Sequence, residues 1–236
     1  MGCPIADTTL YHRAPASPMM SPKSLLPLVA SLLALVLASC ANKTVTLGPD
    51  GKPIDSRGKP TNPFPPGTYD HFKAEADYPK TMKVWKNDQL LSQTTPENSR
   101  ILISLPIQRG FLMKGDEVVI DYPISSGVPS RPTPPGNYKI LEKIVDKSSN
   151  AYGRVLDAEG NQVDGETPAD VPEGGKFVGA PMRYWMRLTW DGVGHHIGPI
   201  PRSRRAASHA CIRGPSAVMP LVYRKVKVGT PVSVEE

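Results

Sequence analysis

From residue 100 onward, the chain consists of short apolar runs that are separated by turn residues. Residues 101–105 form one run of strand length, and two more, 110–113 and 118–122, flank a Lys-Gly-Asp turn, which predicts a β-hairpin. Strands at such short and regular spacing favour a mainly β fold, a sandwich or a barrel.

The same pattern continues to the end of the chain. Three further strands are expected at 137–141, 184–189 and 193–197. One short helix is expected at 215–224, and a final strand pair, broken by Gly-Thr-Pro, at 226–234. Residues 143–180 are polar and rich in Gly, Asp and Pro, which predicts a long loop or a hairpin insertion. A connection of that length is usually functional or disordered.

The N-terminal region carries a segment typical of protein export. The apolar run 24–39 follows Lys23 and ends at Cys40; it is too short for a comfortable membrane span but fits the hydrophobic region of a signal peptide. Its end, Leu-Ala-Ser-Cys, resembles the lipobox of bacterial lipoproteins, whose cysteine is acylated and becomes the new N-terminus. We therefore expect residues 1–39 to be a signal peptide, and Cys40 to anchor the mature protein by lipid on the periplasmic side of the cell envelope. An ordinary signal peptide is the alternative.

The residues that follow differ in composition from the strand-rich part. Residues 41–68 contain turn dipeptides without periodic apolar content, which predicts a flexible Pro/Gly-rich tether; residues 69–99 are mixed and remain unassigned; residues 100–236 suffice for one domain. The formal net charge of +6 suits an anionic lipid or polymer. The sequence has no basic run interleaved with aromatic residues, so we expect no nucleic-acid partner.

Cysteine usage directs attention to one residue. The chain has three cysteines, Cys3, Cys40 and Cys211. Removal of the signal peptide takes Cys3 away, and lipid would occupy Cys40. Cys211 is then a free thiol in an oxidising compartment, where thiols normally pair. A lone cysteine is more often buried and inert than reactive, so the neighbours of Cys211 decide between the two interpretations.

Those neighbours favour chemistry. His195 and His196 precede a Ser-His-Ala-Cys cluster at 208–211, and Arg213 follows it. A cysteine nucleophile needs a base or a positive neighbour to become a thiolate, and backbone N–H groups to stabilise the oxyanion that forms on an attacked carbonyl. A small residue before the cysteine lets such groups approach, and an arginine can bind a substrate carboxylate in bidentate fashion.

The cluster resembles the YkuD-type L,D-transpeptidases. That family carries His-Gly on one strand, then Ser/Thr-His-Gly-Cys, then usually Ile/Val-Arg; it also has an upstream Thr-Pro-x-Gly run and a closing Gly-Thr-Pro-Val. The corresponding residues here are His196-Ile197, in which isoleucine replaces the family's glycine, and the segments 208–213, 133–136 and 229–232. The resemblance covers about residues 100–234. It implies a YkuD-like β-sandwich or barrel with one or two short helices, in which residues 100–236 form the catalytic domain.

The resemblance also implies roles for these residues, without a metal or cofactor. Cys211 attacks the carbonyl of the diamino acid in a peptidoglycan tetrapeptide stem and releases the terminal D-Ala, with His196 as the general base and His209 beside the thiol. Backbone N–H groups around Ala210 and Cys211 stabilise the oxyanion. Arg213 orients the substrate, and Ser208 belongs to the same substrate-binding set as a structural partner of His209. An amine from a second stem then resolves the thioester.

Two positions need a choice or depart from the family pattern. Neighbouring strand residues point to opposite faces, so only one of His195 and His196 can face Cys211. We choose His196, which stands where the family has its histidine; an alignment shifted by one residue would select His195. Ala210 replaces the family's glycine. If that glycine needs a positive φ, alanine is unfavourable there; if it needs only to be small, alanine is tolerable.

Other interpretations stay open. The thioester can be resolved by water, as in an L,D-carboxypeptidase. His195 or His196 with His209 and Cys211 can supply metal ligands. The fold can also bind the wall without turnover, as an inactive lipoprotein. Elsewhere, the arginine-rich run 202–205 is either a solvated loop or a contact for an acidic stem. Three aromatic residues are candidates for glycan stacking, although Trp185 is expected in the core: Tyr152, Trp185 and Trp190.

Overall fold

The computed structural model describes residues 46–51, 53–59 and 61–236. The expected signal peptide, Cys40 and the first residues of the tether lie outside the described residues. No described helix is long and apolar enough to cross a lipid bilayer. Mainly β structure with a few short helices is predicted from the sequence, and it is confirmed.

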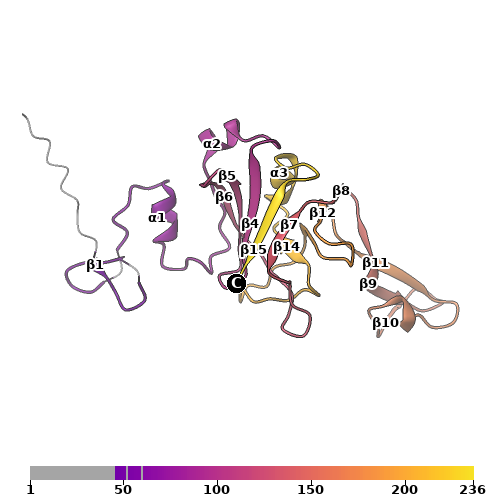
Figure 1. The fold of residues 1–236 in the computed structure, drawn as a ribbon. Helices are drawn as coiled ribbons and strands as arrows, with labels where there is room; N and C mark the ends of the chain where they lie inside the picture. Colours follow the sequence, from indigo (N-terminus) through magenta and orange to yellow (C-terminus); the bar gives the residue numbers. More distant parts are fainter. Residues whose placement is uncertain (1–45, 52, 60) are drawn as a thin grey trace, which may run out of the picture. The chain divides into compact units, whose positions relative to one another are not determined.

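A six-stranded sheet forms one layer of the fold (Figure 1). Its strands, in spatial order, are β3 (Trp85–Lys86), β6 (Glu117–Pro123), β5 (Arg109–Lys114), β4 (Ser99–Ser104), β15 (Pro231–Glu235) and β7 (Gly136–Lys139). Neighbouring strands are antiparallel, except that β15 runs parallel to β4. The predicted hairpin is the β5–β6 pair, which turns at Gly115 with a φ of +56°.

The C-terminal region contains one strand where the sequence predicts a pair. Residues 227–230 form a turn instead, closed by a hydrogen bond from the backbone N–H of Thr230 to the carbonyl of Lys227. The Thr230 hydroxyl accepts from the N–H of Lys227, and Gly229 adopts a φ of +90°. These bonds satisfy the backbone locally, so only β15 pairs with the sheet. The predicted helix is present as α3 (Met219–Arg224).

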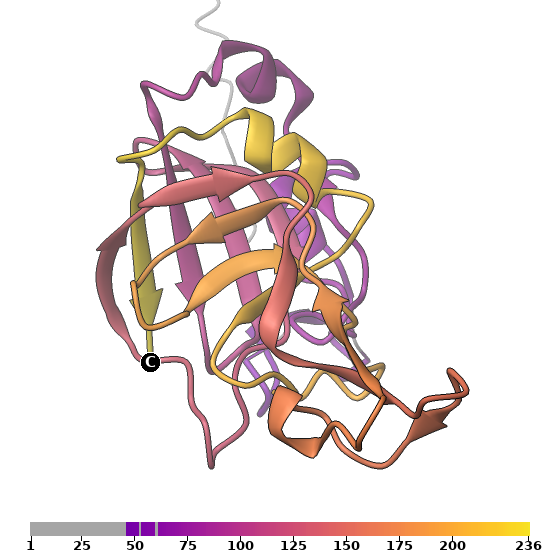
Figure 2. The ribbon, with the colours of Figure 1, turned by 90° about the vertical axis from the view of Figure 1, so that its right-hand side faces the viewer.

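A four-stranded sheet forms the second layer, in front of the first in Figure 2. Its order is β14 (Ile212–Gly214), β13 (Gly194–Ile197), β12 (Trp185–Arg187) and β8 (Glu142–Ile144), with β13 and β14 parallel. One continuous apolar cluster joins the layers: it includes Ile103, Leu112 and Ile120 from the six-stranded sheet and Met186 and Ile212 from the four-stranded sheet. Burial between the layers therefore fixes β13 and β14 on a rigid support.

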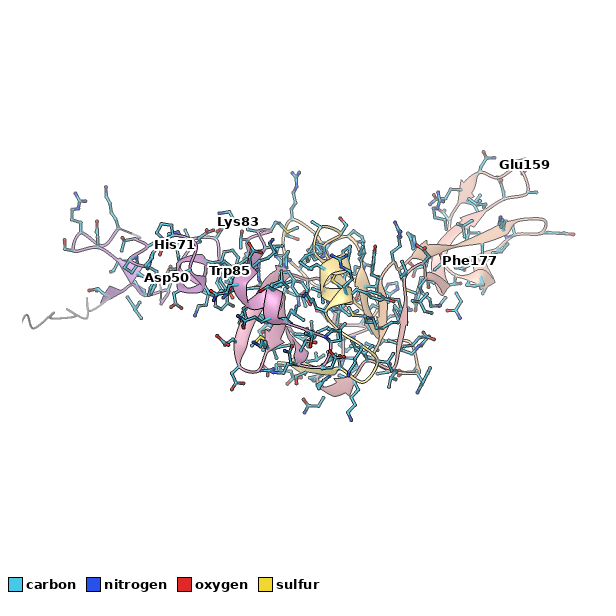
Figure 3. All side chains as sticks on the ribbon, turned by 90° about the horizontal axis from the view of Figure 1, so that it is seen from above. Asp50, His71, Lys83, Trp85, Glu159 and Phe177 are labelled. Atoms are coloured by element: carbon cyan, nitrogen blue, oxygen red, sulfur yellow. The ribbon has the colours of Figure 1, made fainter. Side chains whose placement is uncertain are left out.

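The predicted insertion is a small sheet of its own. It contains β9 (Ser148–Leu156), β10 (Gln162–Val163) and β11 (Lys176–Pro181), in the order β10-β9-β11, and the 3₁₀ helix η1 (Pro168–Asp170). Figure 3 labels Phe177 on β11 and Glu159 at the turn between β9 and β10. The two long strands are antiparallel and place Arg154 opposite Val178.

The N-terminal segment is attached to the six-stranded sheet by hydrogen bonds to a buried ion pair of that sheet. Before β3 it contains the strand pair β1 (Thr46–Leu47) and β2 (Pro53–Ile54) and the helix α1 (Tyr69–Lys73); α2 (Asp88–Gln93) follows β3. The fully buried side chains of Arg109 and Asp121 are 2.6 Å apart, from Nε to Oδ1. The hydroxyls of Tyr69 and Tyr78 donate to the other oxygen of Asp121. Residues 69–78, unassigned from the sequence, are thus fastened to β6.

Candidate active site

The parallel pairing of β13 and β14 brings the histidine and cysteine segments together. His195 lies opposite Ile212, and His196 lies opposite Arg213. Cys211 immediately precedes β14, so it lies beside the histidines despite the loop between the two strands. Because β13 is extended, its two histidines point to opposite faces.

His195 points into the core. It is 1% exposed, with Nδ1 2.8 Å from the Ile212 carbonyl oxygen and Nε2 3.0 Å from the Tyr122 hydroxyl. A carbonyl can only accept, so Nδ1 carries the proton and Nε2 accepts from the tyrosine. Burial lowers the pKa of His195 to about 4 and keeps the ring neutral. His195 therefore links β6, β13 and β14.

His196 faces the same cavity as Cys211. This cavity has a volume of about 300 Å³, and Ser208, His209 and Arg213 also line it. The Nδ1 atom of His196 is 2.7 Å from the carbonyl oxygen of Ile197, which assigns the proton to Nδ1 and leaves Nε2 as an unprotonated base. Burial lowers the pKa of His196 to about 4, so the ring is neutral near pH 7.

Cys211 is a partly buried free thiol. Its Sγ lies 3.6 Å from the Gly192 carbonyl oxygen. Burial raises the pKa of the thiol, and the backbone N–H of Gly194 and the charge of Arg213 oppose that rise without cancelling it. The resting thiol is consequently protonated near neutral pH, and it needs a base before it can act as a nucleophile.

Ala210 adopts a left-handed backbone conformation, with a φ of +71°. The sequence left open whether this position needs a positive φ, and in this chain it has one. The Thr133 hydroxyl donates to the Ala210 carbonyl at 2.8 Å and accepts from the N–H of Gly127 at 2.9 Å. The space is tight, since a Cβ atom built on Gly127 would lie 2.8 Å from the Ala210 Cα. The Thr-Pro run therefore fixes the loop before the cysteine, a function that the sequence motif alone did not assign.

Ser208 is buried, and its hydroxyl bonds a different residue from the one expected. Its hydroxyl donates to the Cys211 carbonyl and not to His209, which corrects that part of the sequence interpretation. Its backbone carbonyl accepts from the N–H of Val128. Ser208 thus closes the short turn that presents Cys211.

His209 contacts an aromatic residue of the insertion. Its ring meets the edge of Tyr152 at a centroid distance of 4.4 Å, and the guanidinium of Arg131 bonds the Tyr152 hydroxyl. Tyr152 and His209 also border a second cavity of about 360 Å³, which Arg154 lines as well. The sequence singled out Tyr152 only as one of three aromatic candidates, because its neighbours in space come from distant segments.

Arg213 borders both cavities and carries an unpaired charge. No carboxylate of the described residues lies within ion-pair distance of it. Burial lowers the pKa of its guanidinium. An anionic group of a ligand would relieve this desolvation, so Arg213 is suited to a carboxylate.

The remaining candidates divide between core and surface. Trp185 is buried as expected, whereas Trp190 is exposed. Arg204, expected in a solvated loop, is buried, and its guanidinium donates to the carbonyls of Ile124 and Gln108. No group of three or more His, Cys, Asp or Glu side chains within the described part of the chain is arranged to hold a metal ion.

Comparisons with known proteins bear on the same region. A family model for the YkuD L,D-transpeptidase catalytic domain matches residues 98–234. Among solved structures, an L,D-transpeptidase from Mycobacterium smegmatis is 25% identical over 59% of this chain and 59% of that chain, with a TM-score of 0.45. A mutant Enterococcus faecium L,D-transpeptidase is 28% identical over 58% and 49%, with a TM-score of 0.42. The chain thus spans less than two thirds of either structure. No curated protein matches it.

Proposed function

The chain belongs to the YkuD family of L,D-transpeptidases, and on that premise we propose that it transfers peptidoglycan stem peptides through a thioester on Cys211. One observation carries the proposal. Cys211, His196 and Arg213 line a single cavity, while the competing histidine, His195, is committed to the core. A base, a nucleophile and a cation for a carboxylate thus face one volume.

The acylation step uses these groups in turn. Nε2 of His196 takes the thiol proton, and the sulfur forms a bond to the carbonyl carbon of the diamino acid. Backbone N–H groups near Ala210 and Cys211 stabilise the negative charge on the carbonyl oxygen. The tetrahedral intermediate then collapses: its C–N bond breaks, and the leaving D-alanine amine takes the proton from His196.

The second step releases the product. A primary amine of another stem attacks the thioester, loses a proton to His196, and forms an amide as the C–S bond breaks. The sulfur leaves as a thiolate and regains a proton from His196. Water in place of the amine gives a shortened stem by the same route. Arg213 holds a substrate carboxylate throughout, and His209 with Ser208 maintains the loop that carries Cys211.

Alanine at position 210 is compatible with this activity. A non-glycine residue in the left-handed region costs roughly 1–2 kcal/mol of conformational free energy, which favourable packing around the loop can offset. The Thr133 hydroxyl holds the Ala210 carbonyl in place, so the strained conformation is fixed by neighbouring groups. This observation favours an active enzyme over an inactive wall-binding protein.

The proposed substrate, assembled peptidoglycan, lies outside the cytoplasmic membrane, so this function requires export. The lipobox-like residues 37–40 support export and a lipid anchor at Cys40. The intact mass of protein expressed in a bacterial host tests the anchor. A diacylglycerol-bearing chain that begins at Cys40 is expected, and Cys40→Ala should abolish the modification. An unmodified wild-type chain in the soluble fraction would contradict the anchor alone.

The reaction itself is tested with purified tetrapeptide muropeptides. Incubation with the wild-type protein should give products that have lost D-alanine and gained either a second stem or water, identified by mass. Cys211→Ser should give none, at an unchanged melting temperature. Intact substrate after incubation with well-folded wild-type protein would refute the proposed function.

A further inference from the structure

Trp190 lies in the turn between β12 and β13 and is 73% exposed, the highest value among the large apolar side chains of the described residues that are exposed. A single exposed apolar residue is ordinary on a protein surface. Trp190 differs from the other exposed apolar residues in two respects: it contacts the guanidinium of Arg187, and its turn contacts Cys211.

The guanidinium of Arg187 packs against the indole of Trp190. Its guanidinium carbon lies 5.3 Å from the centroid of the Trp190 ring and 5.5 Å from that of the buried Trp185. The Nε atom of Arg187 is bonded to Glu142 at 3.0 Å, which fixes the guanidinium. One terminal nitrogen of Arg187, Nη2, has no partner among the described residues. The indole is therefore in contact with a fixed cation whose free Nη2 N–H groups lie near the ring.

The turn that carries Trp190 is ordered and touches the thiol. The Thr189 hydroxyl accepts from the N–H of Val193 at 3.0 Å, and Gly192 adopts a φ of +113°, which favours glycine. The Gly192 carbonyl oxygen is the atom 3.6 Å from Cys211 Sγ. Trp190 is two residues away, so its Cα lies within about 13 Å of the sulfur. Neither Trp190 nor Gly192 lines the cavity of His196 and Arg213, so Trp190 lies near Cys211 but outside that cavity.

This upper bound on the distance from Trp190 to Cys211 is compatible with the length of the proposed donor. In a tetrapeptide stem, the attacked carbonyl belongs to the third residue, and the sugar is attached before the first. Three extended residues span roughly 10 Å. A stem with its carbonyl at Cys211 Sγ can therefore bring its sugar to the surface that Trp190 occupies.

We propose that Trp190 and Arg187 form a binding platform for the N-acetylated sugar that bears the stem peptide. The proposal rests on the proposed function, since that function supplies the sugar-linked peptide. The flat indole covers the C–H face of a pyranose ring, and the free N–H groups of Arg187 donate to its hydroxyl or acetamido oxygens. The platform sets which donors are used: peptides that are still attached to glycan, in preference to free peptides.

Two donors that share one tetrapeptide test the platform, one with its disaccharide and one without. The wild-type protein should show the lower KM for the disaccharide donor. Trp190→Ala should raise that KM by about tenfold, equivalent to about 1.4 kcal/mol, and leave both kcat and the free-peptide KM unchanged. Trp190→Phe should retain much of the preference because it keeps a flat face. Val228→Ala, at another exposed apolar position, should change neither KM.

Equal KM values for both donors in the wild-type protein would overturn the platform, as would a Trp190→Ala variant that loses activity equally on both. If the wild-type protein turns over neither donor, the proposed function fails, and calorimetric titration with the peptide-free disaccharide tests the platform by itself. Binding that Trp190→Ala abolishes would support it, and no binding to the wild-type protein would overturn it.

Discussion

At the scale of single residues, hydrogen-bond partners separate two adjacent histidines. Both bond a backbone carbonyl through Nδ1, so both carry their proton there. The Nε2 atom of His195 is occupied by the Tyr122 hydroxyl, whereas the Nε2 atom of His196 belongs to a ring that lines the cavity of Cys211. Strand alternation predicts from the sequence that only one histidine faces the cysteine, and the choice of His196 rests on its place in the motif.

The first prediction contrasts the two histidines. His196→Ala should slow thiol alkylation of Cys211 near neutral pH by roughly 10²–10⁴-fold and raise the apparent pKa of the thiol, because the base is lost. His195→Ala should slow alkylation at most about tenfold, but should lower the free energy of unfolding by about 1–3 kcal/mol, because Tyr122 and the Ile212 carbonyl lose their partner in the core. Alkylation rates measured against pH, with melting curves of both variants, check this. A larger kinetic loss in His195→Ala would show that the assignment is wrong.

The second prediction concerns the strained backbone at Ala210. Ala210→Gly removes a left-handed penalty of roughly 1–2 kcal/mol and adds about 0.5–1 kcal/mol of unfolded-state entropy, so stability should be unchanged or slightly higher and activity should change little. Ala210→Val should abolish turnover, since a β-branched residue is disfavoured at positive φ and would crowd the oxyanion donors. Melting temperatures and initial rates of both variants and of the wild-type protein test these expectations. A valine variant as active as the wild-type protein would show that this position does not shape the site.

At the scale of elements, local signals predict local structure well. The β5–β6 hairpin follows from two apolar runs around Gly115, and α3 follows from the spacing of its apolar residues. The region 226–234 misleads because Val226 is buried in the core like a strand residue, although its backbone leads into a turn. Local periodicity reports burial, and it does not distinguish a buried turn from a strand.

Long-range pairing is what the sequence could not supply. The buried contact between Arg109 and Asp121 fits their opposite charges, but the tyrosines that complete it lie 43 and 52 residues away from Asp121. The same holds for Thr133, which meets Ala210 across 77 residues. The motif indicated that the Thr-Pro run matters, but only the fold identifies the hydrogen bonds that it makes.

The third prediction tests that buried attachment. Asp121→Ala leaves the Arg109 guanidinium charged and unpaired in the core, which should lower the free energy of unfolding by about 3–5 kcal/mol. Residues 69–84 should then exchange their amide hydrogens faster. Tyr69→Phe is the matched control: it removes one hydrogen bond to Asp121 and should cost only about 1 kcal/mol. Similar losses in the two variants, from chemical denaturation, would indicate that the ion pair does not hold this segment.

At the scale of the whole molecule, the chain combines a two-layer β support with a site on a single parallel strand pair. The layers bury an apolar cluster that includes Ile212, next to Cys211, so Cys211 is placed by the core and not by a free loop. The mainly β class and the cysteine segment were predictable from the sequence, because both are indicated by short patterns of contiguous residues. The sequence indicated Tyr152 and Trp190 only as aromatic candidates; their contacts with His209, Arg131 and Arg187 were not predictable, because they depend on how separate elements pack.

The proposed function depends on acylation of Cys211 by the stem peptide. The most direct test is the mass of the intact protein within seconds of mixing with a tetrapeptide donor in the absence of an acceptor amine, followed by peptide mapping. We predict a mass increase equal to the stem without its terminal D-alanine, located on the peptide that contains Cys211 and absent in Cys211→Ser. Turnover of the donor by Cys211→Ser, or an adduct on any other residue of the wild-type protein, would contradict it.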